Sequence, residues 1–273
     1  HTEYSLLDGA NKVQKLFERI KALKQPAVAM TDHGNMFGTV EFYREAMSHG
    51  IKPIIGCEIY VAPTSRFERK GVDKGPKEYN NHLILLAMNK EGYRNLCKLV
   101  SLGYTEGFYY KPRIDKNLLE EFNGGLIALS ACLQGEVAQA LSAGNIGKAK
   151  AAAESYAAIF SDRYYIEIQD NKLAEQQRLN PLLVELAKDL SLPVVTTNDC
   201  HYGERADYRA HDVLLCVQTG KTVHEENRLK METDELYLKS AEEMTKGFEY
   251  CPEAVERTLE IAERCNVEIE FGK

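Results

Sequence analysis

Short apolar runs alternate with amphipathic stretches along about two hundred residues, and this alternation leaves only a few folds open. Each run is rich in Val, Ile, Leu or Tyr and is bounded by Gly, Pro, Asn or Asp, which is typical of a buried strand. The predicted strands lie at residues 26–34, 52–63, 80–89, 125–135, 164–170 and 192–202.

The stretches between these runs predict helices. In residues 9–24 the apolar side chains fall on one helical face, with Asp8 as a candidate N-cap and Pro26 as the stop. Strand followed by helix, repeated along the chain, predicts parallel pairing through right-handed crossovers, in a barrel or a doubly wound sheet. Further helices are predicted at residues 36–49, 93–102, 146–160 and 174–190.

The distribution of candidate ligands favours the barrel. They stand near strand ends around the whole series, whereas a doubly wound sheet gathers its site at one switch point. The chain opens on what reads as the tail of a strand, so the first strand is expected to be truncated. After His201 the pattern changes to acidic, helix-prone segments. We therefore predict a barrel domain over residues 1–203 and a helical connector over residues 204–273, with a long basic loop at residues 65–79.

The composition limits which partners the chain can bind and in which cellular compartment it is expected. The 273 residues carry a formal net charge of −7, so binding to nucleic acid would require a local basic patch. No apolar run approaches the roughly 20 residues that span a bilayer, and no signal peptide is recognisable, so no membrane partner is expected. Seven cysteines without a C-x-x-C pair indicate a reducing, cytoplasmic setting, with most cysteines in the core.

Metal-binding residue types recur at or near the predicted strand ends. Burying many imidazoles and carboxylates together is costly unless they are paired or bind cations. Imidazole, carboxylate and thiolate all suit zinc, and carboxylate-rich sets also suit manganese. The spacing Asp199-x-His201 places both side chains on one face of a strand, where both can reach the same barrel mouth. The candidates are His1, Asp8, Asp32, His33, Glu58, His82, Cys132, Asp199 and His201.

Each candidate also has an ordinary structural explanation. His33 fits a loop or a helix cap, and His82 fits the start of a strand. Asp8 fits an N-cap, Glu58 fits an ion pair with a lysine, and Cys132 fits a core cysteine. The metal site is favoured because the candidates recur at the same end of successive strands. Three further histidines fit no strand end and are interpreted as surface or structural residues: His49, His211 and His224.

Several segments resemble the PHP (polymerase and histidinol phosphatase) domain at the N-terminus of bacterial DNA polymerase III alpha subunits. They are "HTEYSLLDGA", "TDHGNMFG", "GCEIYVAP", "NNHLILLAMN", "YYKPRID", "LSACLQGEV" and "NDCHY", and the resemblance extends into the tail "EAVERTLEIAERCN". It implies an α/β fold, a distorted (β/α)7 TIM-like barrel of the PHP type with a short helical C-terminal extension. It also implies a cluster of up to three zinc or manganese ions at the C-terminal ends of the strands.

The resemblance assigns roles residue by residue. His1 corresponds to the second histidine of a His-x-His motif, whose first histidine would precede residue 1. The predicted catalytic residues are Asp32, His33, Asp199 and His201, and within this set the resemblance places Asp32 next to His33 without direct contact to an ion. The implied metal ligands are His1, Asp8, His33, Glu58, His82, Cys132, Asp199 and His201.

Three functions remain open at this stage. The first is metal-dependent hydrolysis of a phosphodiester at a DNA 3′ end, as in a 3′–5′ exonuclease, with Lys111 and Arg113 contacting phosphate and Tyr109 and Tyr110 stacking on a base. For both pairs, an ordinary loop or packing role is the alternative. The second function is a non-catalytic, metal-stabilised module that braces the rest of the polymerase chain and docks a proofreading subunit. The third is a small-molecule phosphatase. No carboxylate triad of a polymerase palm is identifiable, so polymerase activity is not expected of these residues.

Overall fold

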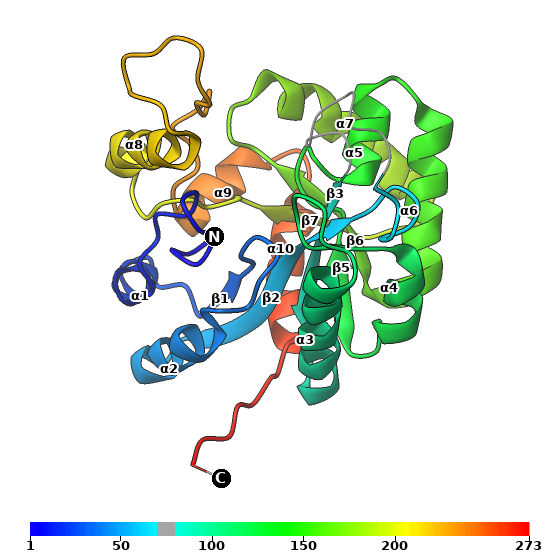
Figure 1. Cartoon of the computed structure of the whole chain (residues 1–273), viewed down its shortest axis with the longest axis horizontal. Coiled ribbons are helices and arrows are strands. Elements are labelled where there is room, and N and C mark those ends of the chain that lie inside the picture. Colours follow the sequence, from blue (N-terminus) through cyan, green and yellow to red (C-terminus); the bar gives the residue numbers. More distant parts are fainter. Residues whose placement is uncertain (70–79, 273) are drawn as a thin grey trace.

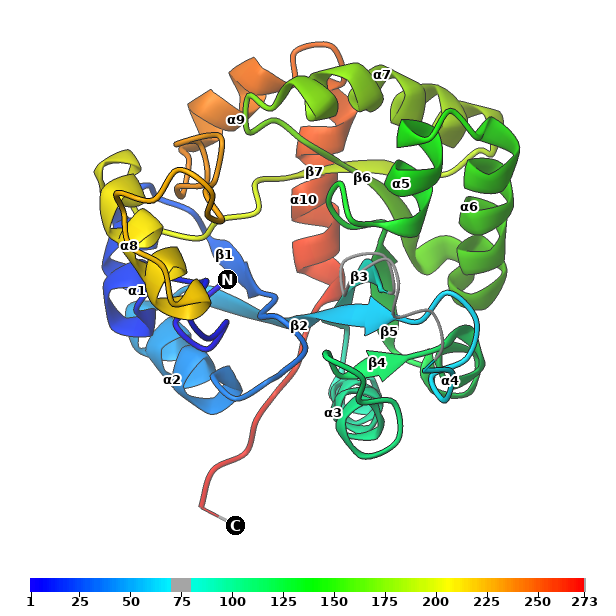
Figure 2. The same cartoon turned by 45° about the horizontal axis from the view of Figure 1, so that its top comes forward.

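The computed structural model describes residues 1–69 and 80–272, in which one mixed seven-stranded sheet curls into an open, distorted barrel. The strand order is β1-β2-β3-β5-β6-β7, and β4 pairs with β2 outside this path. Figures 1 and 2 show the curved sheet with most helices on its outer side. The strands are β1 (Ala27–Met30), β2 (Lys52–Val61), β3 (Asn81–Ala87), β4 (Arg113–Ile114), β5 (Leu126–Leu129), β6 (Tyr164–Gln169) and β7 (Val194–Thr197). The α/β barrel predicted from the sequence is confirmed.

The helices begin and end where the local sequence favours it. Side-chain oxygens of Asn89, Asp115 and Asn145 accept backbone N–H groups in the first turns of α3, α4 and α6. The predicted N-cap at Asp8 is wrong: α1 follows Lys12 without a side-chain cap, and Asp8 lies elsewhere. The helices are α1 (Val13–Ala22), α2 (Thr39–His49), α3 (Lys90–Thr105), α4 (Lys116–Phe122), α5 (Glu136–Ser142), α6 (Ile146–Phe160), α7 (Ala174–Asp189), α8 (Tyr208–Thr219), α9 (Ala241–Gly247) and α10 (Pro252–Arg264).

One strand runs against the predicted direction. β3 is antiparallel to both β2 and β5, whereas β1–β2, β5–β6 and β6–β7 are parallel pairs. A parallel pair needs a long crossover, usually a helix. The connection between β2 and β3 has no helix in its described part, and residues 70–79 of the predicted basic loop lie outside the described residues. The expectation of parallel pairing throughout is therefore wrong at β3.

Strand alternation divides the sheet into two faces with different partners. On β2, Ile55 and Ile59 face the outer helices, whereas Ile54 faces inward, where α10 packs through Ile261 and Ala262. The same inward face changes character along the strands. Near α10 it is apolar, and at the opposite end it carries polar side chains, beginning with Glu58. The barrel interior is thus apolar at one end and polar at the other.

The C-terminal helix α10 packs against the sheet of the barrel. Figures 1 and 2 show α10 along the inner side of the sheet, beside β7. Arg257 of α10 donates to the backbone carbonyl of Val194 over 2.9 Å. In the described parts of the chain, no helix combines the length and apolarity needed to cross a membrane.

Candidate metal centre

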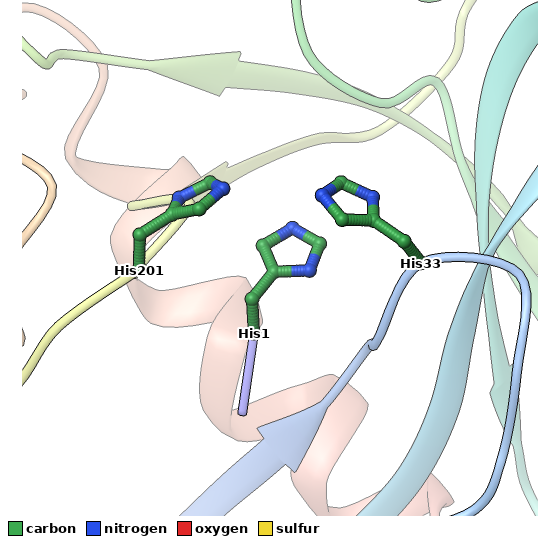
Figure 3. Close-up of side chains that lie close together, drawn as sticks. All are labelled: His1, His33 and His201. Atoms are coloured by element: carbon green, nitrogen blue, oxygen red, sulfur yellow. The ribbon is translucent and has the colours of Figure 1, made fainter. Parts of the chain in front are cut away.

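All eight predicted ligands lie at the polar end of the barrel. They come from the N-terminal segment, the turns after β1, β5 and β7, the second half of β2 and the start of β3. Figure 3 shows three of them, His1, His33 and His201, with their rings turned toward one another. The ring centroids of His1 and His33 are 4.0 Å apart, and those of His1 and His201 are 4.5 Å apart. The structure thus brings together the set that the sequence only suggests.

Backbone geometry places two of these side chains. Gly34 has φ of +63°, and a Cβ at this position would lie 2.8 Å from Pro112, so the turn that presents His33 requires glycine. Asp199 has φ of +52°, an unusual conformation for a residue other than glycine. β7 ends at Thr197, so Asp199 and His201 both lie in the turn that follows it, and the prediction that one strand face carries both side chains is wrong.

The antiparallel direction of β3 explains the position of His82. The ligands in the turns after β1, β5 and β7 follow their strands, but His82 stands at the start of β3. Because β3 runs opposite to β2, its start lies beside the end of β2, and His82 pairs with Tyr60 in the sheet register. The antiparallel strand β3 thus contributes a ligand, His82, from its own N-terminal end.

Glu58 occupies the middle of one group of ligands. Its Oε1 atom lies 2.8 Å from Nδ1 of His33 and 2.8 Å from Nδ1 of His82. The other oxygen, Oε2, lies 3.8 Å from Nε2 of His1. Burial favours a neutral carboxyl, but the positive charges of His82 and His33 outweigh this effect and hold the pKa of Glu58 well below its usual range. A buried carboxylate with two imidazoles on one oxygen is suited to a position between cations.

Asp8 links the remaining histidines. Its Oδ2 atom is 2.7 Å from Nε2 of His33 and 3.4 Å from Nε2 of His201. His1 completes this side, with Nε2 3.1 Å from Oδ1 of Asp199. Burial lowers the pKa of His33, but the charge of Glu58 and the hydrogen bond to Asp8 prevail and raise the pKa to about 10. Without a metal ion, His33 is therefore protonated and donates to both carboxylates.

The donor atoms form three groups that suit a metal ion. Within each group, one donor atom from every residue lies within 4.8 Å of the others. In a tetrahedral zinc site with bonds of about 2.0 to 2.3 Å, ligand atoms lie roughly 3.3 to 3.8 Å apart, so donor atoms within 4.8 Å can share an ion after side-chain shifts of about 1 Å. The residues present therefore fit a cluster of divalent ions. The groups are His1–His33–His201, Glu58–His82–Cys132 and His1–Glu58–Asp199.

Cys132 adds a thiol to the second group. Its sulfur lies 3.7 Å from Nδ1 of His82. Burial, followed by the negative charges of Glu58 and Asp199, raises the pKa of this thiol well above its ordinary value. A nearby divalent cation reverses that preference, because a coordinating thiol is deprotonated. Cys132 is thus a thiol that becomes a strong ligand when a cation is present.

The direct catalytic role assigned to Asp32 does not agree with its position. Its side chain is fully buried. It accepts hydrogen bonds from the backbone N–H and the hydroxyl of Thr2, over 2.6 and 2.7 Å, and from the hydroxyl of Ser5, over 2.8 Å. Ser5 in turn contacts His1 and the backbone N–H of His33. Asp32 therefore anchors the segment between His1 and Asp8, and its carboxylate is not exposed at the site.

The two residues predicted to contact phosphate, Lys111 and Arg113, lie in different surroundings. Arg113 is buried, and its guanidinium donates to the backbone carbonyls of Gly107, Arg66 and Glu68, so its predicted role in binding phosphate is wrong. Lys111 is exposed, with Nζ 5.3 Å from the centre of the Tyr60 ring, which borders the rings of His33 and His82. Lys111 therefore lies at the rim of the candidate centre.

Two residues that border the centre are not among the site residues predicted from the sequence. Of the two interpretations of His211, surface or structural, the structural one agrees with its position: the residue is fully buried against Asp8 and His201, next to the candidate centre. Glu167 lies on the inward face of β6, and alternation in "YYIEIQ" would have placed it there. Glu167 also lines an apolar cavity of about 410 Å³ in the barrel interior that reaches His1 and Glu58.

Comparisons with known proteins give a consistent result. Residues 1–171 match the family described as PHP domain. The chain is 51% identical over 270 residues to DNA polymerase III subunit alpha of Treponema pallidum, covering 98% of the chain and 23% of that relative. It is 48% identical to the corresponding protein of Deinococcus radiodurans, covering 100% of the chain and 21% of the relative. The chain thus spans less than a quarter of the length of these relatives.

A solved structure with a lower similarity is a putative metal-dependent phosphoesterase from Bifidobacterium adolescentis. It is 13% identical in sequence, with a TM-score of 0.40, over 69% of this chain and 82% of that one.

Proposed function

The chain belongs to the PHP domain family, and we propose that it binds a cluster of divalent metal ions and uses it to hydrolyse a phosphodiester at the 3′ end of DNA. The observation that supports this proposal is the convergence of eight side chains of metal-binding types, seven in groups that could hold an ion and Asp8 beside His33, from segments up to about two hundred residues apart. Zinc and manganese are the proposed ions, because imidazole, carboxylate and thiolate donors occur together.

The three carboxylate ligands would take different positions in the cluster. Glu58 would lie between ions, because both of its oxygens face imidazole nitrogens. Asp8 and Asp199 would hold the ions on the side of His201. Bound divalent ions lower the pKa of a water molecule toward neutrality and neutralise negative charge on the leaving oxygen. Protons compete with cations for these donors, so metal binding is expected to strengthen as the pH rises.

The substrate would be guided by residues at the rim. Lys111 offers a positive charge beside Tyr60, and a lysine ammonium binds phosphate as a point charge. Tyr110 is exposed in the same loop and could stack on an unpaired base. Because the net charge of the chain is −7, a local contact of this kind is needed to hold DNA.

The relatives suggest the setting in which this activity would operate. They are alpha subunits of DNA polymerase III from bacteria, and we infer that the chain works beside the rest of a polymerase chain in the bacterial cytoplasm. A frayed primer 3′ end would be the substrate. A proofreading subunit is a further proposed partner.

The test is metal-dependent release of nucleotides from single-stranded DNA by the purified protein. His82→Ala removes one ligand and is expected to lower both the amount of bound metal and the rate of release. His224→Ala is the matched control, because His224 is an exposed histidine outside the predicted ligand set. Addition of zinc or manganese after chelation should restore the activity of the control and of the wild type.

The alternative function predicts a different result. If the wild type binds metal but releases no nucleotide, the site is structural, and the domain braces the polymerase or docks a proofreading subunit. If the wild type instead hydrolyses a small phosphomonoester and ignores DNA, it is a small-molecule phosphatase. Equal activity of His82→Ala and wild type would contradict the proposed metal centre.

A further inference from the structure

His211 lies on α8, beyond the residues that match the PHP domain family, and yet it borders the candidate metal centre. Both ribbon views show α8 beside the N-terminal segment of the chain (Figures 1 and 2). The side chain of His211 has no exposed surface. A buried histidine on a solvent-facing helix at this place raises the question of what it holds.

The contacts of His211 converge on two predicted ligands. Its Nε2 atom donates to the backbone carbonyl of Asp8 over 2.8 Å, and because a carbonyl can only accept, Nε2 carries the hydrogen. The same nitrogen lies 3.7 Å from Oδ1 of Asp8, a buried atom without a hydrogen-bond partner among the described residues. The ring also packs edge-on against His201, with 5.5 Å between ring centroids.

The loop that carries Asp8 is held by hydrogen bonds rather than by burial of its apolar side chains. Leu6 and Leu7 are 66% and 43% exposed, so burial of their side chains does little to hold the loop. Leu7 also has φ of +59°, a strained conformation for a residue with a Cβ. Such a conformation persists only where the surroundings fix it. The bond from His211 reaches Asp8, the next residue, from a helix about two hundred residues away in the sequence.

The helix that carries His211 is itself held firmly. Arg228 donates to both carboxylate oxygens of Asp212 over 2.6 and 2.8 Å. Leu215 and Cys216 are buried, and Gly220 ends the helix in the left-handed conformation that glycine favours. His211 therefore extends from a fixed support.

We propose, building on the metal-centre function above, that His211 is a positioning residue for the divalent ion that Asp8 and His201 would share. Its N–H fixes the backbone of Asp8, and its ring lies in contact with His201. A residue of α8 thus determines the positions of Asp8 and His201 in the centre. A residue that orients a metal ligand in this way typically changes metal affinity about 10-fold to 100-fold when it is replaced.

Two amides of different length test this proposal. In His211→Gln the side-chain N–H group reaches approximately the place of Nε2, whereas in His211→Asn it reaches only the place of Nδ1. Zinc affinity is measured by competition with a coloured chelator, alongside the absorption spectrum of the cobalt-substituted protein. We expect His211→Asn to bind zinc at least about 10-fold more weakly than the wild type and to show an altered cobalt spectrum. His211→Gln should remain within about 3-fold of the wild type, and His224→Asn is the exposed control.

The outcomes separate this proposal from the proposed function. If His211→Asn is folded and binds zinc as tightly as the wild type, the positioning role is wrong while the metal centre stands. If His211→Gln loses as much affinity as His211→Asn, the N–H of His211 is not what positions Asp8, and the proposal is overturned. The Gln variant decides this even where the Asn variant fails to fold. A wild-type protein that binds no zinc or cobalt would overturn the metal centre and, with it, the role of His211.

Discussion

Glu167 should make the folded chain less stable as the pH rises. Its carboxyl is buried on the inward face of β6. Oε1 accepts hydrogen bonds from the Thr197 hydroxyl and, over 3.2 Å, from the Gln169 amide. Oε2 is buried with no hydrogen-bond partner in the described part of the chain. Burial, helped by the charge of Asp199, raises the pKa of Glu167 from 4.5 to about 7, against the opposing effect of the Thr197 bond.

The size of the effect follows from that pKa. One pKa unit corresponds to about 1.4 kcal/mol, so ionisation of Glu167 costs about 3 kcal/mol more in the folded chain than in the unfolded chain. Below pH 4.5 the carboxyl is protonated in both states, and no stability is lost. Stability falls as the pH rises from about 4.5 through about 7, because the unfolded chain then releases the proton more readily. Above that range the penalty is constant.

Glu167→Gln removes the ionisable group and tests this reasoning. Urea unfolding followed by circular dichroism, in the presence of a chelator, gives the free energy of unfolding of variant and wild type at pH 5 and pH 8. We expect the variant to gain about 2 to 3 kcal/mol relative to the wild type between these pH values. Glu120→Gln, at an exposed position of α4, should show no such gain. The same difference between Glu167→Gln and wild type at both pH values would refute the account.

Other predictions concern packing and DNA binding. Gly92→Ala should lower the free energy of unfolding by about 2 to 3 kcal/mol, because the new Cβ would lie 1.8 Å from the Gly125 carbonyl oxygen. Gly147→Ala, which also adds a Cβ in the first turn of a helix, should instead raise it by up to about 1 kcal/mol, because this Cβ would have no atom closer than 3.8 Å. Urea unfolding checks both, and equal effects would contradict the packing. Lys111→Ala should reduce the salt dependence of single-stranded DNA binding by about 0.7 in log–log slope and leave bound metal unchanged. Lys98→Ala, on the exposed side of α3, should change neither quantity.

Local sequence patterns predicted the elements whose formation depends on neighbouring residues. The helix predicted at residues 146–160 agrees with α6 at both ends, because its cap Asn145 and its alanine-rich face are local features. The strand predicted at residues 164–170 likewise agrees with β6 to within one residue. The two-residue strand β4 was missed, because two residues are too few to show a pattern.

Features that depend on distant contacts were harder to predict. The direction of β3 depends on a connection without a helical crossover, and the sequence pattern treated it like the other connections. His211 stands on a helix without any ligand spacing, and only tertiary packing brings it to Asp8. The buried environment of Arg113 was invisible for the same reason, since its partners are backbone carbonyls at other positions. The eight ligand candidates were predicted from the resemblance together with their positions at strand ends, and their role in binding metal stays a prediction.

The most direct test of the central claim is anomalous X-ray scattering from crystals grown with zinc or manganese. The account predicts anomalous peaks at the polar end of the barrel, about 2.0 to 2.3 Å from donor atoms of His33, Glu58 and His82. Well-ordered crystals with no peak in this pocket, or with peaks only on the outer surface, would contradict it.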